Sequence, residues 1–269
     1  MSTHSLPRNA ATEHAFDTPL SVAVASRDAD VLGLVERALA KGRAQLAFQP
    51  VVVASEPDRI AFHEGLVRVT DSGGRVIPAS HFMPVIEETA LGRQLDAVTL
   101  DLALRLLKYQ PDLRLSINVS ARSLGDGEWR RTLESALSAP GSLGDRLIFE
   151  ISETSAMMLH EVVVRFMEEM QPRGVCFALD GFGGGMIAFR HLKDFFFDLV
   201  KVDKSFVRGI AQEPDNQVLV KALITVAHQF EMVAVVEGVE DEADAAFLTS
   251  IGADCLQGWL YGQPSFDLA

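Results

Sequence analysis

The stretch FALDGFGGG, residues 177–185, is the part of the sequence from which the fold is most directly inferred. It continues an apolar run over residues 175–179, which predicts a buried strand because turn residues follow at once. Asp180 then stands where this strand opens into a glycine-rich loop. A carboxylate in that position needs a metal, another cation or hydrogen-bond donors, since it cannot pack with apolar side chains. A capping aspartate before a turn explains the stretch taken alone, so recurrence of the pattern along the chain decides between the two interpretations.

Length, charge and composition restrict the classes of protein to which the chain can belong. At 269 residues, with 48% apolar and 7% aromatic residues, it is long enough for one large domain with a sizeable core. We expect a flexible lead over residues 1–20, which show no sustained period, and one domain over residues 21–269. The net charge of -13 argues against binding a nucleic acid polymer or an anionic membrane, so a phosphate ligand would need metals or a few focused basic side chains. With no apolar run near the roughly 20 residues of a membrane span and no signal-peptide order at the start, we expect a cytoplasmic protein.

Strand-like and helix-like stretches alternate along most of the chain. Strands are predicted over residues 45–53, 61–69, 113–119, 147–152, 175–180, 199–203, 233–239 and 253–259. Helices are predicted over residues 28–41, 91–109, 129–138, 156–171, 187–193, 216–230 and 242–251. Such an α/β alternation predicts a largely parallel sheet with helices outside, and eight strands in roughly 250 residues favour a closed (β/α)₈ barrel over an open sheet. No GxGxxG motif opens a helix after the first strand, as a dinucleotide-binding fold would require.

Polar side chains stand near the end of one predicted strand after another. They are Glu64, Asn118, Glu150, Asp180, Lys201 with Asp203, Glu237 and Gln257. In a (β/α)₈ barrel the carboxyl ends of the strands meet on one face, where active sites are built. Each residue alone has an ordinary explanation, such as a turn former, but together they put four carboxylates around one barrel mouth. Like charges that close raise one another's pKa unless cations neutralise them, and hard oxygen ligands suit Mg²⁺, Mn²⁺ or Ca²⁺ better than zinc. We therefore expect a divalent-metal site.

Several reactions use a barrel mouth of this kind. Phosphodiester hydrolysis uses two metal ions to generate hydroxide and to stabilise both oxygens of the displacement. Enolase-type proton abstraction uses a metal on acids from successive strands with a lysine base. A Schiff-base aldolase would rely on Lys201 alone and would not need so many acids. The residue types do not decide between the first two reactions. The histidines are too scattered along the sequence to predict a cluster.

A series of short motifs follows in a fixed order along the chain. They read Gln49-Pro50, Glu64-Gly65-Leu66 with Arg68, Asn118-Val119-Ser120, Glu150-Ile151-Ser152-Glu153, Lys201-Val202-Asp203, Glu237-Gly238-Val239-Glu240 and Gln257-Gly258. With these motifs at these spacings the chain resembles the EAL domain family, the cyclic-di-GMP phosphodiesterases of bacterial signalling. The resemblance covers roughly residues 31–264 and favours phosphodiester hydrolysis over the enolase-type reaction.

The resemblance implies a TIM-like barrel whose first strand runs antiparallel to the others, and a role for each matching residue. Metal-binding positions match Glu64, Asn118, Glu150, Asp180 and Glu237. Catalytic positions match Glu64, Glu237 and Lys201, of which Lys201 assists the attacking water. Ligand-binding positions match Gln49, Arg68, Asp203 and Gln257, and Glu153 matches an acid that organises the loop after Asp180. The resemblance also implies Mg²⁺ or Mn²⁺ as cofactor, Ca²⁺ as an inhibitor, cyclic-di-GMP as ligand and a homodimer formed through that loop.

The glycine-rich stretch departs from the family pattern. The family reads Asp-Asp-Phe-Gly-Thr-Gly where this chain reads Asp180-Gly181-Phe182-Gly183-Gly184-Gly185. Gly181 therefore lacks the carboxylate that serves the second metal in active enzymes, while the set that matches the first metal is complete. Consecutive glycines admit many backbone states that are lost on ordering, which predicts a looser loop and weaker coupling to dimerisation.

Three functional hypotheses follow from the motifs and the departure. The leading one is a cyclic-di-GMP-binding domain with weak or absent phosphodiesterase activity, because the ligand-contacting positions are retained. The first alternative is an active metal-dependent phosphodiesterase giving linear pGpG, in which water or Asp203 replaces the missing ligand. The second alternative is a protein-interaction module with an unidentified partner and no nucleotide, which a loss of ligand-contacting residues would favour and the sequence does not show.

Overall fold

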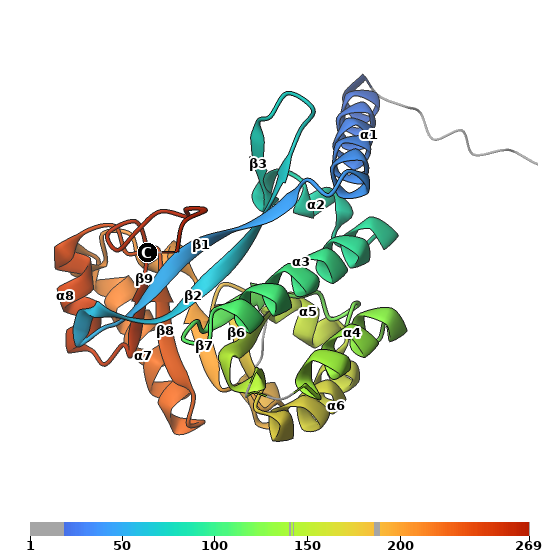
Figure 1. Ribbon diagram of the computed structural model, residues 1–269. Coiled ribbons are helices and arrows are strands. Elements are labelled where there is room, and N and C mark those ends of the chain that lie inside the picture. The colour runs from blue at the N-terminus through green and yellow to red at the C-terminus, as the bar shows by residue number, and fades with distance from the viewer. Residues whose placement is uncertain (1–18, 140, 142, 186–188, 269) are drawn as a thin grey trace, which may run out of the picture.

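The computed structural model describes residues 19–139, 141, 143–185 and 189–268 of the chain. Its strands are β1 (Ala44–Val53), β2 (Glu56–Thr70), β3 (Val76–Pro78), β4 (Leu115–Asn118), β5 (Leu147–Ser152), β6 (Cys176–Phe182), β7 (Leu199–Val202), β8 (Val233–Glu237) and β9 (Cys255–Gln257). Its helices are α1 (Pro19–Ala40), α2 (Met83–Ile86), α3 (Ala90–Tyr109), α4 (Gly127–Leu137), α5 (Glu153–Met158), α6 (His160–Met170), α7 (Pro214–Gln229) and α8 (Glu242–Ser250). The strands form one sheet in the order β1-β9-β8-β7-β6-β5-β4-β2-β3, and β1 also pairs with β2, which closes a barrel surrounded by helices (Figure 1).

The strand directions confirm the predicted barrel with an antiparallel first strand. β1 runs antiparallel to both of its neighbours, β2 and β9. The pairs from β2–β4 round to β8–β9 are all parallel. The eight predicted strands all lie in the barrel, whereas β3, which pairs with the end of β2, is an additional strand. Its three residues are too few to show a strand period in the sequence.

The barrel strands are apolar on both faces, because helices cover the outside and side chains fill the inside. On β5, Phe149 faces outward and packs against Phe166 of α6, with 6.0 Å between the ring centroids. Ile148 faces inward and belongs to a cluster inside the barrel. This inner cluster consists of Val51, Phe62, Ile148, Ala178, Leu199, Val235 and Cys255.

Beyond one end of the barrel, β1 and β2 continue as a long hairpin that carries a second, smaller core (Figure 1). Here Val35 and Ala38 of α1 pack with Val69 at the end of β2. The remaining members of this small core are Ile77, Phe82, Ile86 and Leu95. The helix predicted over residues 28–41 lies within α1, which starts earlier, at Pro19, a residue suited to a first helical turn. Most of the lead predicted over residues 1–20 falls outside the described residues.

Two predicted helices differ in the structure. The helix predicted over residues 156–171 is split into α5 and α6, because Leu159 leaves the helical region with φ -125° and ψ 42°. The segment predicted as an α-helix over residues 187–193 contains instead a 3₁₀ helix, Phe189–Asp194, with residues 186–188 outside the described range. Of its described side chains Leu192 alone is buried, which is too little for the apolar stripe that stabilises an α-helix. Among the described helices, none is long and apolar enough to cross a membrane.

Candidate functional site at the barrel mouth

The facing of the polar residues at the barrel mouth can be derived from the inner cluster, because side chains alternate between the two faces of a strand. Side chains two residues apart point to the same face of a strand. Each site residue therefore stands two positions after an inner-cluster residue in the pairs Phe62 and Glu64, Ile148 and Glu150, Ala178 and Asp180, Leu199 and Lys201, Val235 and Glu237, and Cys255 and Gln257. In β1, which runs the other way, Gln49 precedes Val51 by two positions and pairs with Glu64. Asn118 ends β4 and pairs with Glu150.

Lys201 lies among the carboxylates, with only 1% of its side chain exposed. Its Nζ donates to Oε2 of Glu64 at 2.9 Å and to Oε2 of Glu150 at 2.8 Å, and it lies 2.7 Å from Oε1 of Glu237. Burial lowers the pKa of Lys201, but the charges of Glu150, Glu237, Glu64 and Asp180 outweigh it and raise that pKa well above its usual value. The lysine is therefore a fixed positive charge and not a proton acceptor.

Glu64 connects the two sides of the mouth through hydrogen bonds to both of its oxygens. Asn118 Nδ2 donates to Oε1 at 2.9 Å, and Gln257 Nε2 donates to Oε2 at 2.7 Å. The same Gln257 nitrogen lies 3.3 Å from Oε1 of Gln49. Burial alone would raise the pKa of Glu64, but the charge of Lys201 and the hydrogen bonds from Gln257, Lys201 and Asn118 lower it overall. Glu64 is thus held as a carboxylate.

The other carboxylates of the mouth carry an excess of negative charge. Burial and then the charge of Glu64 raise the pKa of Glu150 well above its usual value. Burial is also the main cause that raises the pKa of Asp180, and it raises the pKa of Glu237 to about 7. Lys201 lowers all three pKa values, but one ammonium cannot balance four carboxylates.

The oxygens of this set fit a hard divalent cation such as Mg²⁺ or Mn²⁺. In the part of the chain that the structure describes, Oε1 of Glu150 is buried and has no hydrogen-bond partner. A buried acceptor left in that state is costly, and a buried excess of carboxylates is more so. A cation held by Glu64, Asn118, Glu150 and Asp180 would neutralise the excess charge and give this oxygen a partner. Glu64 and Glu150 would then be shared between the cation and Lys201.

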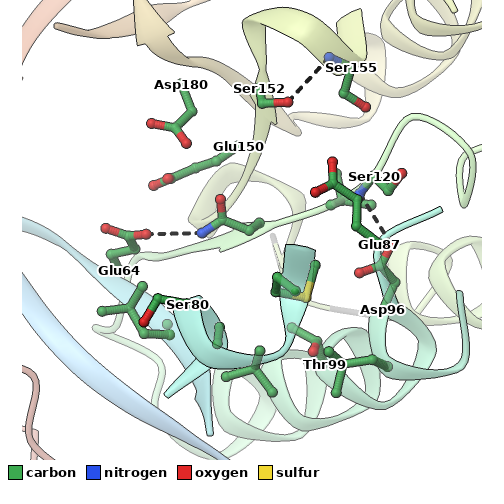
Figure 2. A pocket seen from close by; sticks show the side chains of 18 residues that line it. Glu64, Ser80, Glu87, Asp96, Thr99, Ser120, Glu150, Ser152, Ser155 and Asp180 are labelled. Carbon is green, nitrogen blue, oxygen red and sulfur yellow. Dashed lines mark hydrogen bonds between the residues drawn. The ribbon is translucent and has the colours of Figure 1, made fainter. Parts of the chain in front are cut away.

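Two cavities open from the carboxylate cluster. The first cavity, of about 420 Å³, runs from Glu64 and Glu150 toward Asp96 and Thr99 of α3 (Figure 2). The second cavity, of about 470 Å³, lies toward the strands on the other side of Glu64 and is lined by Gln49, Gly181, Asp203, Glu237, Gln257 and Trp259, among others. Glu64, Leu66 and Asp180 line both cavities, so they form a wall common to the two.

Asp96 lines the first cavity and was not identified from the sequence. Its side chain points toward Ser120, and its Oδ2 accepts hydrogen bonds from Ser120 N at 3.1 Å and from Ser123 Oγ at 2.6 Å (Figure 2). Burial raises the pKa of Asp96 to about 6. The available signal was an acid on the apolar face of a predicted helix, directly after Leu95 and four residues before Leu100.

The model of the EAL domain family matches residues 34–264. The chain belongs to the EAL domain family. Among its curated relatives, the bifunctional diguanylate cyclase/cyclic di-GMP phosphodiesterase MucR of Pseudomonas aeruginosa is 28% identical over 235 residues, which cover 86% of this chain and 34% of MucR. The cyclic di-GMP phosphodiesterase PdeR of Escherichia coli is 31% identical over 205 residues, which cover 75% of this chain and 31% of PdeR. The chain thus spans about a third of the length of these relatives.

Solved EAL domains share the architecture of this one. The PaMucR phosphodiesterase in complex with c-di-GMP aligns with a TM-score of 0.79 at 28% identity, covering 88% of this chain and 97% of that one. The FimX EAL domain from Pseudomonas aeruginosa bound to c-di-GMP aligns with a TM-score of 0.77 at 27% identity, with the same coverage of 88% and 97%.

The second cavity of this EAL domain contains Gly181, where the sequence predicts a departure from the family motif. Gly181 adopts φ +75°, and no atom lies within 4 Å of the place that a Cβ would take. Asp203 lines the same cavity, and its charge contributes to the raised pKa of Asp180, so the two acids are within electrostatic reach. Oδ1 of Asp203 also accepts from Ser205 N at 2.8 Å. The fold therefore leaves room for a side chain at Gly181 and places Asp203 in the same cavity.

The two remaining predicted residues lie at the edge of the EAL site. Glu153 begins α5 and is buried, and a Cβ added to Gly185 would lie 2.1 Å from its Oε2. Position 185 therefore requires a glycine, because a side chain there would clash with Glu153. The prediction of a looser loop did not take this close contact into account. Arg68 follows Glu64 on the same face of β2, but it lines neither of the two cavities and donates from Nη1 to the carbonyl of Val67 at 3.0 Å.

Proposed function

We propose that this EAL domain binds cyclic-di-GMP and hydrolyses it slowly or not at all. The observation that carries the proposal is the pair of cavities, about 420 and 470 Å³, on either side of one charged cluster. Cyclic-di-GMP has two guanosine halves joined through two phosphates, so a ligand lying across the mouth can place one base in each cavity. The c-di-GMP complexes of PaMucR and FimX support the same choice of ligand.

Groups in both cavities have the chemistry to hold a guanine. Oδ2 of Asp96 in the first cavity already accepts two hydrogen bonds, so Oδ1 is the oxygen that can accept from the ring N–H or the amino group of the base. Trp259 in the second cavity is 63% exposed and offers a face on which a base can stack. The amides of Gln49 and Gln257 complete the polar lining of that cavity, and we expect Arg68 to turn toward the ligand phosphate.

We expect weak hydrolysis because the second metal would have fewer protein ligands than the first. We expect the first metal, Mg²⁺ or Mn²⁺, to be held by Glu64, Asn118, Glu150 and Asp180. The position of a second metal keeps Asp180 and Glu237 but receives no side-chain oxygen from Gly181. A pair of such ions supplies a nucleophile at neutral pH and stabilises both oxygens of the displacement.

Side chains at the mouth can still assist a residual hydrolysis of cyclic-di-GMP. Glu237, with a pKa of about 7, is the group best suited to take a proton from an attacking water at neutral pH. Lys201 holds its proton and offers positive charge beside a phosphate. Any residual turnover should therefore depend on both side chains.

One observation favours an active phosphodiesterase as the second candidate. Asp203 lines the same cavity as Gly181 and is within electrostatic reach of Asp180. An acid there, together with water, can replace the missing ligand at a cost in metal affinity. The two candidates predict the same binding of cyclic-di-GMP and differ in turnover.

Single-turnover hydrolysis separates the candidates, with protein in excess over cyclic-di-GMP and saturating Mn²⁺ or Mg²⁺. Gly181→Asp and, as a blank, Glu64→Ala are assayed in parallel. We expect the parent to match the blank and Gly181→Asp to gain turnover. Rapid turnover by the parent, with little change in Gly181→Asp, would replace the proposal by the active enzyme. Equilibrium dialysis that detects no binding of cyclic-di-GMP would instead favour a protein-interaction module.

A further inference from the structure

A cluster of two histidines and one aspartate lies where α6 meets the segment between β6 and β7. Nε2 of His160 lies 3.7 Å, and Nδ1 of His191 lies 3.8 Å, from the same atom, Oδ2 of Asp194. The three ligand atoms all lie within 4.8 Å of one another. This finding corrects the expectation from the sequence that the histidines form no cluster.

Local backbone geometry brings the three side chains together. His191 and Asp194 belong to the 3₁₀ helix Phe189–Asp194, in which residues three apart eclipse because each turn takes 3.0 residues. His160 is the first residue of α6, which places its ring beside the 3₁₀ helix. Its ring packs edge-on against Phe195, with 4.6 Å between the ring centroids, which limits rotation of the imidazole.

A simple histidine–aspartate pair elsewhere in the chain gives a contrast. Nε2 of His228 lies 2.9 Å from Oδ2 of Asp254, at hydrogen-bond distance. The two histidine nitrogens near Asp194 are both farther from its oxygen than a hydrogen bond allows. In addition, Nε2 of His160 is buried and, among the described residues, has no hydrogen-bond partner. The three possible ligand atoms are therefore close enough to one another, within 4.8 Å, to bind a single cation.

We propose that His160, His191 and Asp194 form a binding site for a divalent transition metal, with Zn²⁺ as the best match. Two imidazole nitrogens and a carboxylate oxygen are donors that Zn²⁺ prefers, whereas Mg²⁺ and Ca²⁺ prefer oxygen alone. Zinc bonds of roughly 2.0–2.1 Å in a tetrahedron put ligand atoms roughly 3.3 Å apart. The distances of 3.7 and 3.8 Å therefore need only a small contraction. Since the three side chains are 31–40% exposed, water can take the fourth position.

This site is separate from the barrel mouth in both residues and chemistry. None of its three residues lines the first or the second cavity. Its ligands come from α6 and from the segment that follows the glycine-rich loop, so a bound metal would fasten that segment to α6. The site stands or fails independently of cyclic-di-GMP hydrolysis.

Zinc binding by the full chain tests the proposal. The Glu64→Ala background, with excess Mg²⁺ present, suppresses binding of Zn²⁺ at the mouth, and competition with a chromogenic chelator measures affinity and stoichiometry. We expect one Zn²⁺ per chain, with affinity weakened by about 10- to 100-fold or more in His191→Ala and Asp194→Asn. His228→Ala removes a histidine from the simple pair and should leave the affinity unchanged.

Two further measurements separate a metal ligand from a structural role. Asp194→His restores a donor that Zn²⁺ accepts, so it should bind Zn²⁺ more tightly than Asp194→Asn, although both remove the carboxylate. Co²⁺ in the same site should give the intense visible absorption of a tetrahedral nitrogen-containing site, and His191→Ala should abolish it. Sub-stoichiometric Zn²⁺ binding, or equal affinity in His191→Ala with a parent-like circular dichroism spectrum, would overturn the proposal.

Discussion

The two sides of the barrel mouth share a common wall but differ in the ligands they offer. On the side of the first cavity, Asn118, Glu150 and Asp96 supply side-chain oxygens, and all three are tied into hydrogen bonds or ion pairs. On the side of the second cavity, Gly181 supplies no side-chain oxygen, and the acids other than the shared Glu64 and Asp180 are Asp203, Glu237 and Glu240. The comparison indicates that the fold does not depend on a side chain at Gly181, because that position faces open space. A residue of the buried network has no such freedom.

Replacement of Lys201 by Met should give the largest effect, because both sides depend on its charge. Glu64, Glu150 and Glu237 would remain buried together without their cation, and breaking a buried ion pair costs about 3–5 kcal/mol. We expect the free energy of unfolding at neutral pH, measured with urea in metal-free buffer, to fall by that amount. Lys221→Met, at an exposed position on α7, is the control, and equal losses in the two variants would contradict the prediction.

Asp96 tests the first cavity alone through the pH dependence of stability. Its pKa is about 6 in the folded protein against a usual 3.8, a difference worth about 3 kcal/mol. The folded state holds the proton of Asp96 more tightly than the unfolded state does. The stabilisation from this proton is therefore complete below about pH 4, is lost as the pH rises toward about 6, and is absent above that pH. Urea unfolding from pH 4 to 7 should show this loss in the parent and a smaller one in Asp96→Asn. Asp101→Asn, at a half-exposed position on the same helix, should keep the parent slope, and equal slopes in all three proteins would exclude Asp96 as the cause.

Glu64→Gln tests the wall that the two sides share. The substitution keeps the size of the side chain but removes the charge on which a metal at the mouth depends. We expect the affinity for cyclic-di-GMP in the presence of Mg²⁺, measured by calorimetry, to fall by about 100-fold. Glu134→Gln on α4 serves as a remote control. Binding in Glu64→Gln as tight as in that control would show that the ligand does not depend on a metal at Glu64.

Gly181 should give the smallest effect, because the cost of a side chain there comes from the backbone and not from a clash. At φ +75° a residue with a Cβ pays about 1 kcal/mol, and nothing lies within 4 Å of the added atom. Gly181→Ala and Gly181→Asp should therefore both lower the free energy of unfolding slightly in metal-free buffer. Added Mn²⁺ should raise the stability of Gly181→Asp more than that of Gly181→Ala. If the two variants respond equally to Mn²⁺, the second cavity does not gain a metal ligand from this position.

Strand periodicity explains why so much of the mouth could be predicted from the sequence. Glu150 and Lys201 each stand on a strand that its apolar residues reveal, and the alternation of strands and helices predicts that these strands run parallel. The barrel then brings their carboxyl ends together. The roles assigned to these residues stay predictions, because position alone does not establish them.

Features that depend on packing between distant segments could not be predicted in the same way. Asp96 enters the site from a helix, and its place depends on how α3 packs beside β4. His160 and His191 meet where α6 lies beside the 3₁₀ helix Phe189–Asp194, which stands in place of the predicted α-helix. Neither contact leaves a period or a motif in the sequence, although the spacing of His191 and Asp194 suits a 3₁₀ turn.

The long hairpin gives the N-terminal helix a mechanical connection to the mouth. β2 carries Glu64 at the barrel and Val69 in the small core with α1, and the five residue steps from one to the other span roughly 17 Å. The ladder between β1 and β2 has no bulge from Ala44 paired with Val69 to Val51 paired with Phe62. The hairpin therefore joins α1 to the mouth through a continuous ladder of paired residues. We expect a displacement of α1 to be passed along this ladder toward Glu64.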